Sequence, residues 1–200
     1  MPTAETLESI CNAALDIVGE RPAASLIDNR AEVRWFVRNY TRYVQASLRQ
    51  NIWNFAAELW QLNQDASAPP FRWKYRYGLP NGWLRVLPIT YDGCRTGTRV
   101  NFEVKSNFVY TDLSVNAKVE LIMDRQNPGE WDPLFANLLI ARMAHGMAQT
   151  LTHKTSYVQM AKAAVDEAYA IADEVNAFEG DAPPIDQHDV IRVRSLGFSS

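Results

Sequence analysis

The chain has 200 residues, of which 47% are hydrophobic and 22% charged, and a formal net charge of −3 at pH 7. These values are close to globular averages and predict one folded domain, or a domain with an insertion. The slight acidity argues against a dedicated nucleic-acid binder, which usually carries a basic surplus. We also expect neither a signal peptide nor a membrane span, because no basic segment precedes an apolar core and no apolar run approaches about 20 residues.

The N-terminal quarter of the chain predicts two helices. Apolar residues recur at helical spacing from about Thr3 to Val18, and Gly19 supplies a stop. A second helix is expected to begin near Asn29, where Glu32 follows as in a capping box, and to reach about residue 51. Its apolar face is predicted to comprise Val33, Val37, Tyr40, Val44 and Leu48. A short connection favours an antiparallel pair.

From about residue 56 to residue 123 the hydrophobic period changes to that of strands. The run 71–77 alternates rings (Phe71, Trp73, Tyr75, Tyr77) with cations (Arg72, Lys74, Arg76). We interpret it as an amphipathic strand with its rings in the core. The alternative is a base-stacking platform, which the opposite placement of rings and charges disfavours. Further strands are predicted at 84–87, 100–104, 107–110 and 119–122, with a turn at Asn81-Gly82.

Helical spacing returns at Trp131 and predicts two more helices. The first opens at Asp132-Pro133, with proline in its first turn, and continues to about residue 151. The second is expected from about Thr155 to Phe178. Its inner side is predicted to comprise Val158, Ala161, Val165, Ala168, Tyr169, Ala172 and Val175. Beyond residue 180 no period is sustained, which predicts an extended tail.

Together these elements predict an α+β fold, in which a helical bundle built from the N- and C-terminal helices carries a central β-rich insertion. The predicted parts are an N-terminal helical hairpin (1–55), the β-rich insertion (56–128), a C-terminal helical pair (129–179) and the tail (180–200). Trp53 and Phe55 stand where the period changes. We expect both side chains to be buried where the bundle meets the strands.

The sequence contains no recognisable catalytic or cofactor-binding motif. It has neither a Gly-x-x-x-x-Gly-Lys-Ser/Thr phosphate loop nor a Gly-x-Gly-x-x-Gly fingerprint, and no serine occupies Gly-x-Ser-x-Gly. The three histidines and two cysteines lack the spacing of a zinc set. We therefore predict a protein that is not an enzyme and needs no cofactor or metal. An enzyme with an unrecognised site is the alternative.

Arginines at steps of four form the strongest charged pattern. Arg34, Arg38 and Arg42, preceded by Arg30, are expected along one ridge of the second helix. Three interpretations stay open: a solvated face, a contact with an acidic surface of a neighbouring subunit or partner, and a phosphate contact with DNA. The last defines a rival function, a small nucleic-acid-binding module that uses this ridge.

Several motifs occur in a characteristic order. They are Ile17-Val18-Gly19-Glu20-Arg21-Pro22 at the end of the first helix, Trp53-Asn54-Phe55-Ala56, Tyr75-Arg76-Tyr77-Gly78-Leu79-Pro80, and Trp131-Asp132-Pro133-Leu134-Phe135. In order and spacing, over roughly residues 5–175, this set resembles the tail tubular protein A family, the head-to-tail adaptors of short-tailed bacteriophages. The resemblance implies a structural virion protein of the viral tail, made in the host cytoplasm.

The resemblance also implies partners. It implies a ring of probably twelve copies between a portal ring and a tail nozzle protein, around a channel that DNA crosses without specific binding. The arginine ridge (Arg34, Arg38 and Arg42) is then expected to contact a neighbouring subunit or the portal. A second contact is expected in the tail, through Arg192, Arg194, Leu196 and Phe198. Tail segments that order on binding suit such docking.

Overall fold

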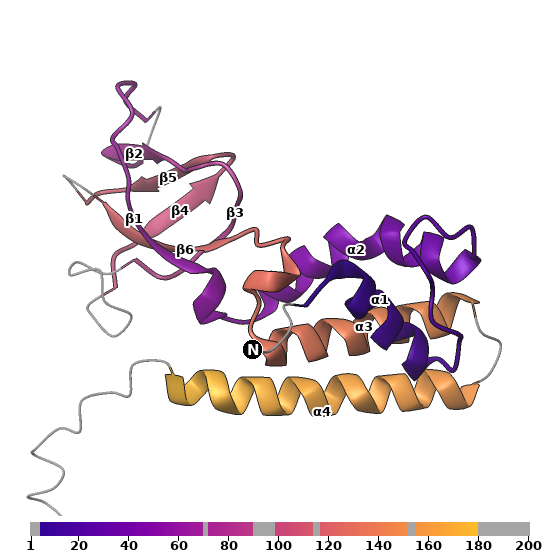
Figure 1. Cartoon of the computed structure of the whole chain (residues 1–200). Coiled ribbons are helices and arrows are strands. Elements are labelled where there is room, and N and C mark those ends of the chain that lie inside the picture. The colour runs from indigo at the N-terminus through magenta and orange to yellow at the C-terminus, as the bar shows by residue number, and fades with distance from the viewer. Residues whose placement is uncertain (1–4, 70–71, 90–98, 114–116, 152–154, 180–200) are drawn as a thin grey trace, which may run out of the picture.

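The computed structural model describes residues 5–69, 72–89, 99–113, 117–151 and 155–179. Helices α1 (Leu7–Ile17) and α2 (Ala31–Gln50) precede the strands, and α3 (Pro133–Leu151) and α4 (Thr155–Glu179) follow them. The four helices lie together, and the strands project from one end of the bundle (Figure 1). The predicted α+β fold, a bundle from both ends of the chain with a central β-rich insertion, is confirmed.

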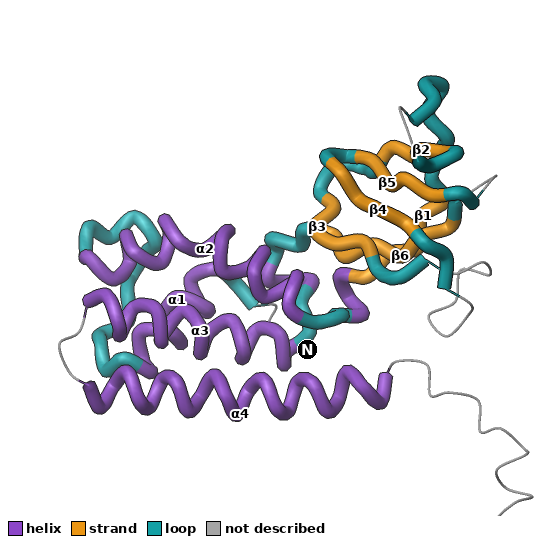
Figure 2. Tube along the Cα trace, turned by 180° about the vertical axis from the view of Figure 1, so that it is seen from behind, coloured by secondary structure: helices purple, strands orange, loops and turns teal. Residues whose placement is uncertain are grey.

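Helix α3 forms the centre of the bundle. It contacts α1, α2 and α4, and ten of its 19 residues are buried. Figures 1 and 2 show α2 along one side of the bundle and α4 along the opposite side, with α1 and α3 between them. Close approach of α2 depends on Gly146, because a Cβ atom there would lie 2.6 Å from Trp35 Cη2 and would also collide with Tyr43 Oη.

The helix ends differ in part from the prediction. Helix α1 begins at Leu7, after a capping box in which Thr6 Oγ1 accepts from Ser9 N at 3.1 Å. Gly19 has a φ of 74°, which suits the predicted stop. The predicted Asn29–Glu32 box is wrong: α2 begins at Ala31 after Arg30, which makes no side-chain cap. The guanidinium of Arg30 instead holds the preceding loop by donating to the Arg21 carbonyl at 2.6 Å.

The predicted apolar face of α2 is wrong at one position. Val37 is 48% exposed, whereas Trp35 and Phe36 are buried. Four of the five predicted residues, Val33, Tyr40, Val44 and Leu48, do lie in the core. Trp35 is buried because its large ring reaches past the helix edge to α3 at Gly146, a contact that spacing alone does not reveal.

On the inner side of α4, two alanines are fully buried, Ala161 and Ala172. Most of the other predicted positions are half-buried against the core: Val158, Val165, Ala168 and Tyr169. Val175 is 38% exposed, so the prediction fails at the last of these positions. The contact with α3 loosens toward that end of the helix, where Trp53, Phe55 and Val175 line a small hollow.

The insertion, called the β block here, consists of two antiparallel three-stranded sheets. The first has the order β1-β6-β3, with β1 (Ala57–Gln61), β6 (Lys118–Met123) and β3 (Trp83–Val86). The second has the order β2-β5-β4, with β2 (Tyr75–Gly78), β5 (Phe108–Thr111) and β4 (Phe102–Lys105). Ala57 pairs with Ile122 in the first sheet, and Tyr77 pairs with Val109 in the second.

The first sheet has apolar residues on both faces because it belongs to two cores. Ile122 and Leu87 pack with the helices, whereas Val119 and Leu121 pack with Tyr77 of the second sheet. Successive residues of a strand point to opposite faces. In strand β6, the side chain of Ile122 therefore faces the bundle, and the side chains of Val119 and Leu121 face the core of the β block. Strand β6 thus joins the two parts of the molecule.

Two of the strand predictions need correction, and one strand was missed. The 71–77 strand begins only at Tyr75, because Arg72 has a φ of 68°, which no extended strand allows; Phe71 lies outside the described residues. Strand β1 was not predicted, since its Glu58-Leu59-Trp60 centre does not alternate cleanly. Of the 100–104 run, only Phe102 to Val104 lies in β4, although Val100 bonds to Ile89.

Candidate functional site: the bundle junction and the arginine ridge

An aromatic cluster fills the junction between the bundle and the β block. Trp53 is only 3% exposed, and its indole donates to the Ser47 carbonyl at 3.1 Å. Its ring meets Phe135 of α3 edge-on at 5.1 Å between centroids, and the half-buried Phe55 meets Phe135 at the same distance. Trp131 completes the group at 5.0 Å from Phe135. Phe135 is therefore the shared partner of three rings from both sides of the insertion.

The sequence places these rings for a local reason. Helix α2 ends at Gln50, and Asn51 takes an extended conformation. The 3₁₀ turn Asn54–Ala56 then redirects the chain into β1. On the return path, Trp131 follows the 3₁₀ turn Pro128–Glu130 and precedes α3. Each crossing between the bundle and the β block thus combines a short 3₁₀ turn with at least one aromatic residue in or next to it.

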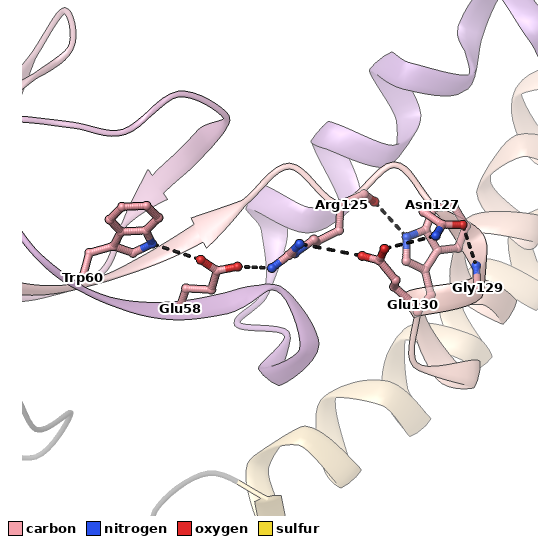
Figure 3. A network of polar contacts seen from close by, with 7 residues as sticks. Glu58, Trp60, Arg125, Asn127, Gly129 and Glu130 are labelled. Atoms are coloured by element: carbon pink, nitrogen blue, oxygen red, sulfur yellow. Dashed lines mark hydrogen bonds and ion pairs between the residues drawn. The ribbon is translucent and has the colours of Figure 1, made fainter.

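A polar network ties β1 to the returning chain (Figure 3). Arg125 forms an ion pair with Glu58 of β1 and a second with Glu130, the latter at 3.7 Å between Nη1 and Oε2. Glu58 also accepts from the Trp60 indole at 3.1 Å. The Arg125 carbonyl accepts from the Trp131 indole at 2.8 Å. One arginine thereby connects the first strand with the turn that opens α3.

Helix α2 also holds the returning segment. The Tyr40 hydroxyl donates to the Gln126 carbonyl at 2.6 Å, and Gln45 donates to an Asp124 carboxylate oxygen at 2.8 Å. Burial raises the pKa of Tyr40, and the Asp124 charge raises it further. The phenol therefore stays protonated and remains a donor. Residues 124–131 are held by both the bundle and the β block, so the position of one part relative to the other is fixed.

The sequence predicted two rings of this junction, of which Trp53 is buried as expected and Phe55 is only half-buried, and it missed the polar network. Trp53 and Phe55 marked the change of period, whereas Glu58 and Arg125 are 67 residues apart and carry no local pattern. Nothing in either segment indicates which charge meets which. The pairing arises from the antiparallel register of β1 and β6, which brings Glu58 opposite Leu121 and leaves Arg125 just beyond the strand end.

The arginine ridge lies on the outer face of α2. Arg34, Arg38 and Arg42 are all exposed. Arg42 donates to Asn39 at 2.9 Å and lies over the Tyr43 ring at 5.3 Å. Among the described residues, no acidic side chain forms an ion pair with any of the three. Arg30 is not part of this surface, because it pairs with Glu20 and Glu32 at the start of the helix.

The basic strand does not present a row of exposed rings. Tyr77 is fully buried and donates to the Leu113 carbonyl at 2.8 Å. Arg76 pairs with Asp65 at 2.8 Å and lies over the Phe108 ring at 4.7 Å. Trp73 is half-buried and donates to Glu103 at 3.0 Å. A stacking platform needs free ring faces, and this arrangement favours the interpretation of rings in the core.

Shallow hollows mark the described surface. One of them measures about 550 Å³ and is polar, lined by Arg72, Trp73, Asn101, Phe102, Glu103 and Asp112. The bond from Lys105 and then that from Trp73 lower the pKa of Glu103. A general acid needs the opposite shift. In the bundle, burial raises the pKa of the Cys11 thiol to about 11, which makes it a poor nucleophile.

Residues 180–200 lie outside the described residues, so the contacts of Arg192, Arg194, Leu196 and Phe198 stay predictions. Within the described ranges, no three His, Cys, Asp or Glu side chains are grouped to hold a metal. No helix there is long and apolar enough to cross a membrane. Comparison of the sequence with protein-family models and with curated proteins gave no match.

Proposed function

We propose that the protein is a structural virion protein, a head-to-tail adaptor whose copies form a ring between the portal and the tail nozzle. The observation that carries the proposal is the junction. A bundle made from both ends of the chain holds a β block at one end through the Phe135 rings and the Arg125 network. An adaptor must keep two binding regions in a fixed relation, and this junction supplies such a connection.

The ordered motif set that resembles the tail tubular protein A family gives the second support. It leads to a ring of probably twelve copies whose channel passes DNA without holding it. Each phosphate contact adds a salt-sensitive hold on the duplex. A net charge of −3 suits a channel that must release DNA. The protein then belongs to the virion tail after synthesis in the host cytoplasm.

The carboxyl groups support a structural role more than a catalytic one. Among the described residues, Asp65 and Glu103 have resolved pKa shifts, and hydrogen bonds lower both. Such shifts are typical of ion pairs at a surface. Catalytic acids need environments that raise the pKa toward neutrality. We accordingly propose that the protein is not an enzyme.

Electron microscopy of the purified protein, alone and mixed with the portal protein of the same virus, tests this function. We expect a monomer or weak oligomer alone and a ring on the portal. Removal of residues 181–200 should leave the fold intact and weaken portal binding, since the tail is predicted to dock there. A stable closed dimer that ignores the portal would contradict the proposal.

A second function is favoured by one observation, the exposed arginine ridge without acidic partners among the described residues. A small nucleic-acid-binding module would use Arg34, Arg38 and Arg42 as phosphate contacts. Its affinity for duplex DNA would fall steeply with salt. The logarithm of the binding constant would fall against the logarithm of the salt concentration with a slope of about −0.9 per neutralised phosphate. Tight, salt-dependent binding of DNA by the isolated monomer would favour this module over the adaptor.

A further inference from the structure

The outer faces of α2 and α4 carry opposite charge. Helix α2 contains four arginines and one glutamate, and that glutamate is paired with Arg30. Helix α4 contains five acidic residues and one lysine. The exposed acids include Glu167 and Glu174, called the acidic row here, which are seven residues apart and so share one face.

The two charged faces point away from each other. Both helices pack on α3, from opposite sides of the bundle (Figures 1 and 2). The arginine ridge and the acidic row are both exposed, and Glu167 also borders the groove that α4 forms with α1 and α3. A single copy therefore cannot bring the two rows together, whereas two copies placed in succession can.

Apolar side chains accompany both rows. Val37 is 48% exposed beside the arginine ridge. On α4, Met160 is 51% exposed and Ile171 is 45% exposed, and Ile171 and Glu167 line a groove of about 260 Å³ between α1, α3 and α4. Exposed apolar groups within a charged frame are typical of a contact surface with an apolar centre and a polar rim.

We propose that the arginine ridge of one copy binds the acidic row of a second copy, so that copies associate head to tail. This inference rests on the proposed ring and names the faces that join its subunits. The charge complementarity favours a copy of this chain over another partner, since the complementary surface is present on every molecule. Because the two faces lie on opposite sides of the bundle (Figures 1 and 2), two copies cannot make both contacts with each other, so the association is heterologous and generates a ring or an open chain, not a closed dimer.

The dimensions of the two rows agree. At a rise of 1.5 Å per residue, the eight steps from Arg34 to Arg42 span about 12 Å, and the seven steps from Glu167 to Glu174 span about 10 Å. Packed helices lie about 8–10 Å apart, a separation that arginine and glutamate side chains bridge easily. The exposed alanines Ala163 and Ala170 lie on the acidic side of α4 and leave room for the partner helix.

A charge-swap experiment tests the pairing. One variant carries Arg34→Glu, Arg38→Glu and Arg42→Glu, and a second carries Glu167→Arg and Glu174→Arg. A control carries Lys74→Glu, Arg99→Glu and Lys118→Glu, three exposed residues of the β block, and so has the same net charge as the first variant. Sedimentation velocity follows self-association at low salt over protein concentrations up to about 1 mM, so that dissociation constants as weak as about 1 mM are detected.

We expect the wild type and the control to associate, and each reversed variant to associate about 100-fold more weakly, since like charges then face each other. An equimolar mixture of the two reversed variants should recover the association, because each contact again joins opposite charges. Recovery in the mixture requires the two faces to meet directly, and a general effect of net charge does not produce it.

Several results would overturn the pairing: a wild type that stays monomeric throughout the series, reversed variants that associate normally, or a mixture that does not recover. Loss of DNA binding alone in the first variant, with normal self-association, would assign the ridge to phosphate contacts. Portal binding separates the two proposals. A wild type that associates through these faces but ignores the portal contradicts only the adaptor function, whereas reversed variants that still form rings on the portal contradict only the pairing.

Discussion

The helical bundle and the β block fill their cores in different ways. The bundle is organised around α3, which is buried by the three other helices. The β block has strands of only four to six residues in two sheets, and one of its sheets lends a face to the bundle. The β block therefore depends on the bundle for part of its packing. We expect a substitution that destabilises the bundle to destabilise the β block as well, whereas a substitution in the core of the β block should leave the bundle folded.

Loss of the junction ring should have the largest effect. Trp53→Ala removes a buried indole that contacts Phe135, and a large-to-small change of this kind costs about 3–5 kcal/mol in the free energy of unfolding. Chemical denaturation measures it, with both regions expected to unfold together. Leu59→Ala is the control, because Leu59 is 77% exposed and its loss should cost less than about 0.5 kcal/mol. A cost below about 1 kcal/mol for Trp53→Ala would make this ring an interface residue and not a core residue.

Tyr77→Ala tests whether the β block can unfold while the bundle stays folded. Tyr77 is the largest fully buried side chain of the β block's core, so its removal should cost about 3 kcal/mol in the free energy of unfolding. We expect hydrogen exchange to show lost protection in β2 and β5 while the amides of α3 keep theirs. Equal loss of protection in α3 would show that the two regions form one cooperative unit.

Gly146→Ala should loosen the bundle by overpacking. The added methyl group would meet Trp35 Cη2 at 2.6 Å and the Tyr43 hydroxyl, and such crowding costs about 1–3 kcal/mol. Thermal unfolding measures the loss. The matched control is Gly78→Ala in β2, where an added Cβ meets no atom within 4 Å. An unchanged melting temperature in Gly146→Ala would mean that α2 can move away from α3 without loss of stability. That result would contradict the claim that the close contact at Gly146 holds the bundle together.

The Glu58–Arg125 pair should have a smaller effect, confined to the connection between the regions. The side chains are 33% and 35% exposed, so their coupling should be about 0.2–1 kcal/mol in a double-mutant cycle of Glu58→Gln and Arg125→Gln. The comparison pair is Glu103 and Lys105, 2.8 Å apart within one strand. Only substitution of the junction pair should change the hydrogen-exchange protection of α3 and β1 together. Zero coupling would remove this ion pair from the account of the junction.

A titration within the β block is the mildest test. The bond from Arg76 lowers the pKa of Asp65. Its folded value lies below the unfolded one, so its contribution to stability is present above the unfolded pKa and is lost as the pH falls through the folded pKa. Carbon-detected NMR should show the Asp65 pKa return toward its ordinary value in Arg76→Gln. The control Arg72→Gln should leave it lowered, and an unchanged pKa in Arg76→Gln would disprove the assigned cause.

The sequence by itself determined the order of elements. The period of 3.6 placed α1 to α4 within a few residues, and Gly19 and Pro133 marked helix ends correctly because their backbone preferences are local. The alternation of two located β3, β5 and β6. The rings at 53, 55 and 131 were visible as large apolar residues at changes of period. Each of these features is encoded within a few neighbouring residues.

Only the tertiary structure decided the contacts between distant segments. Trp35 is buried and Val37 exposed because Gly146 of α3 opens a place for the indole ring. Strand β1 exists because β6 offers it a partner along its whole length, although its own alternation is poor. Arg125 meets Glu58 through the register of that pairing. Such contacts join residues far apart in the chain. Local propensity carries no information about which distant residue will pack against a buried side chain or pair with a charged one.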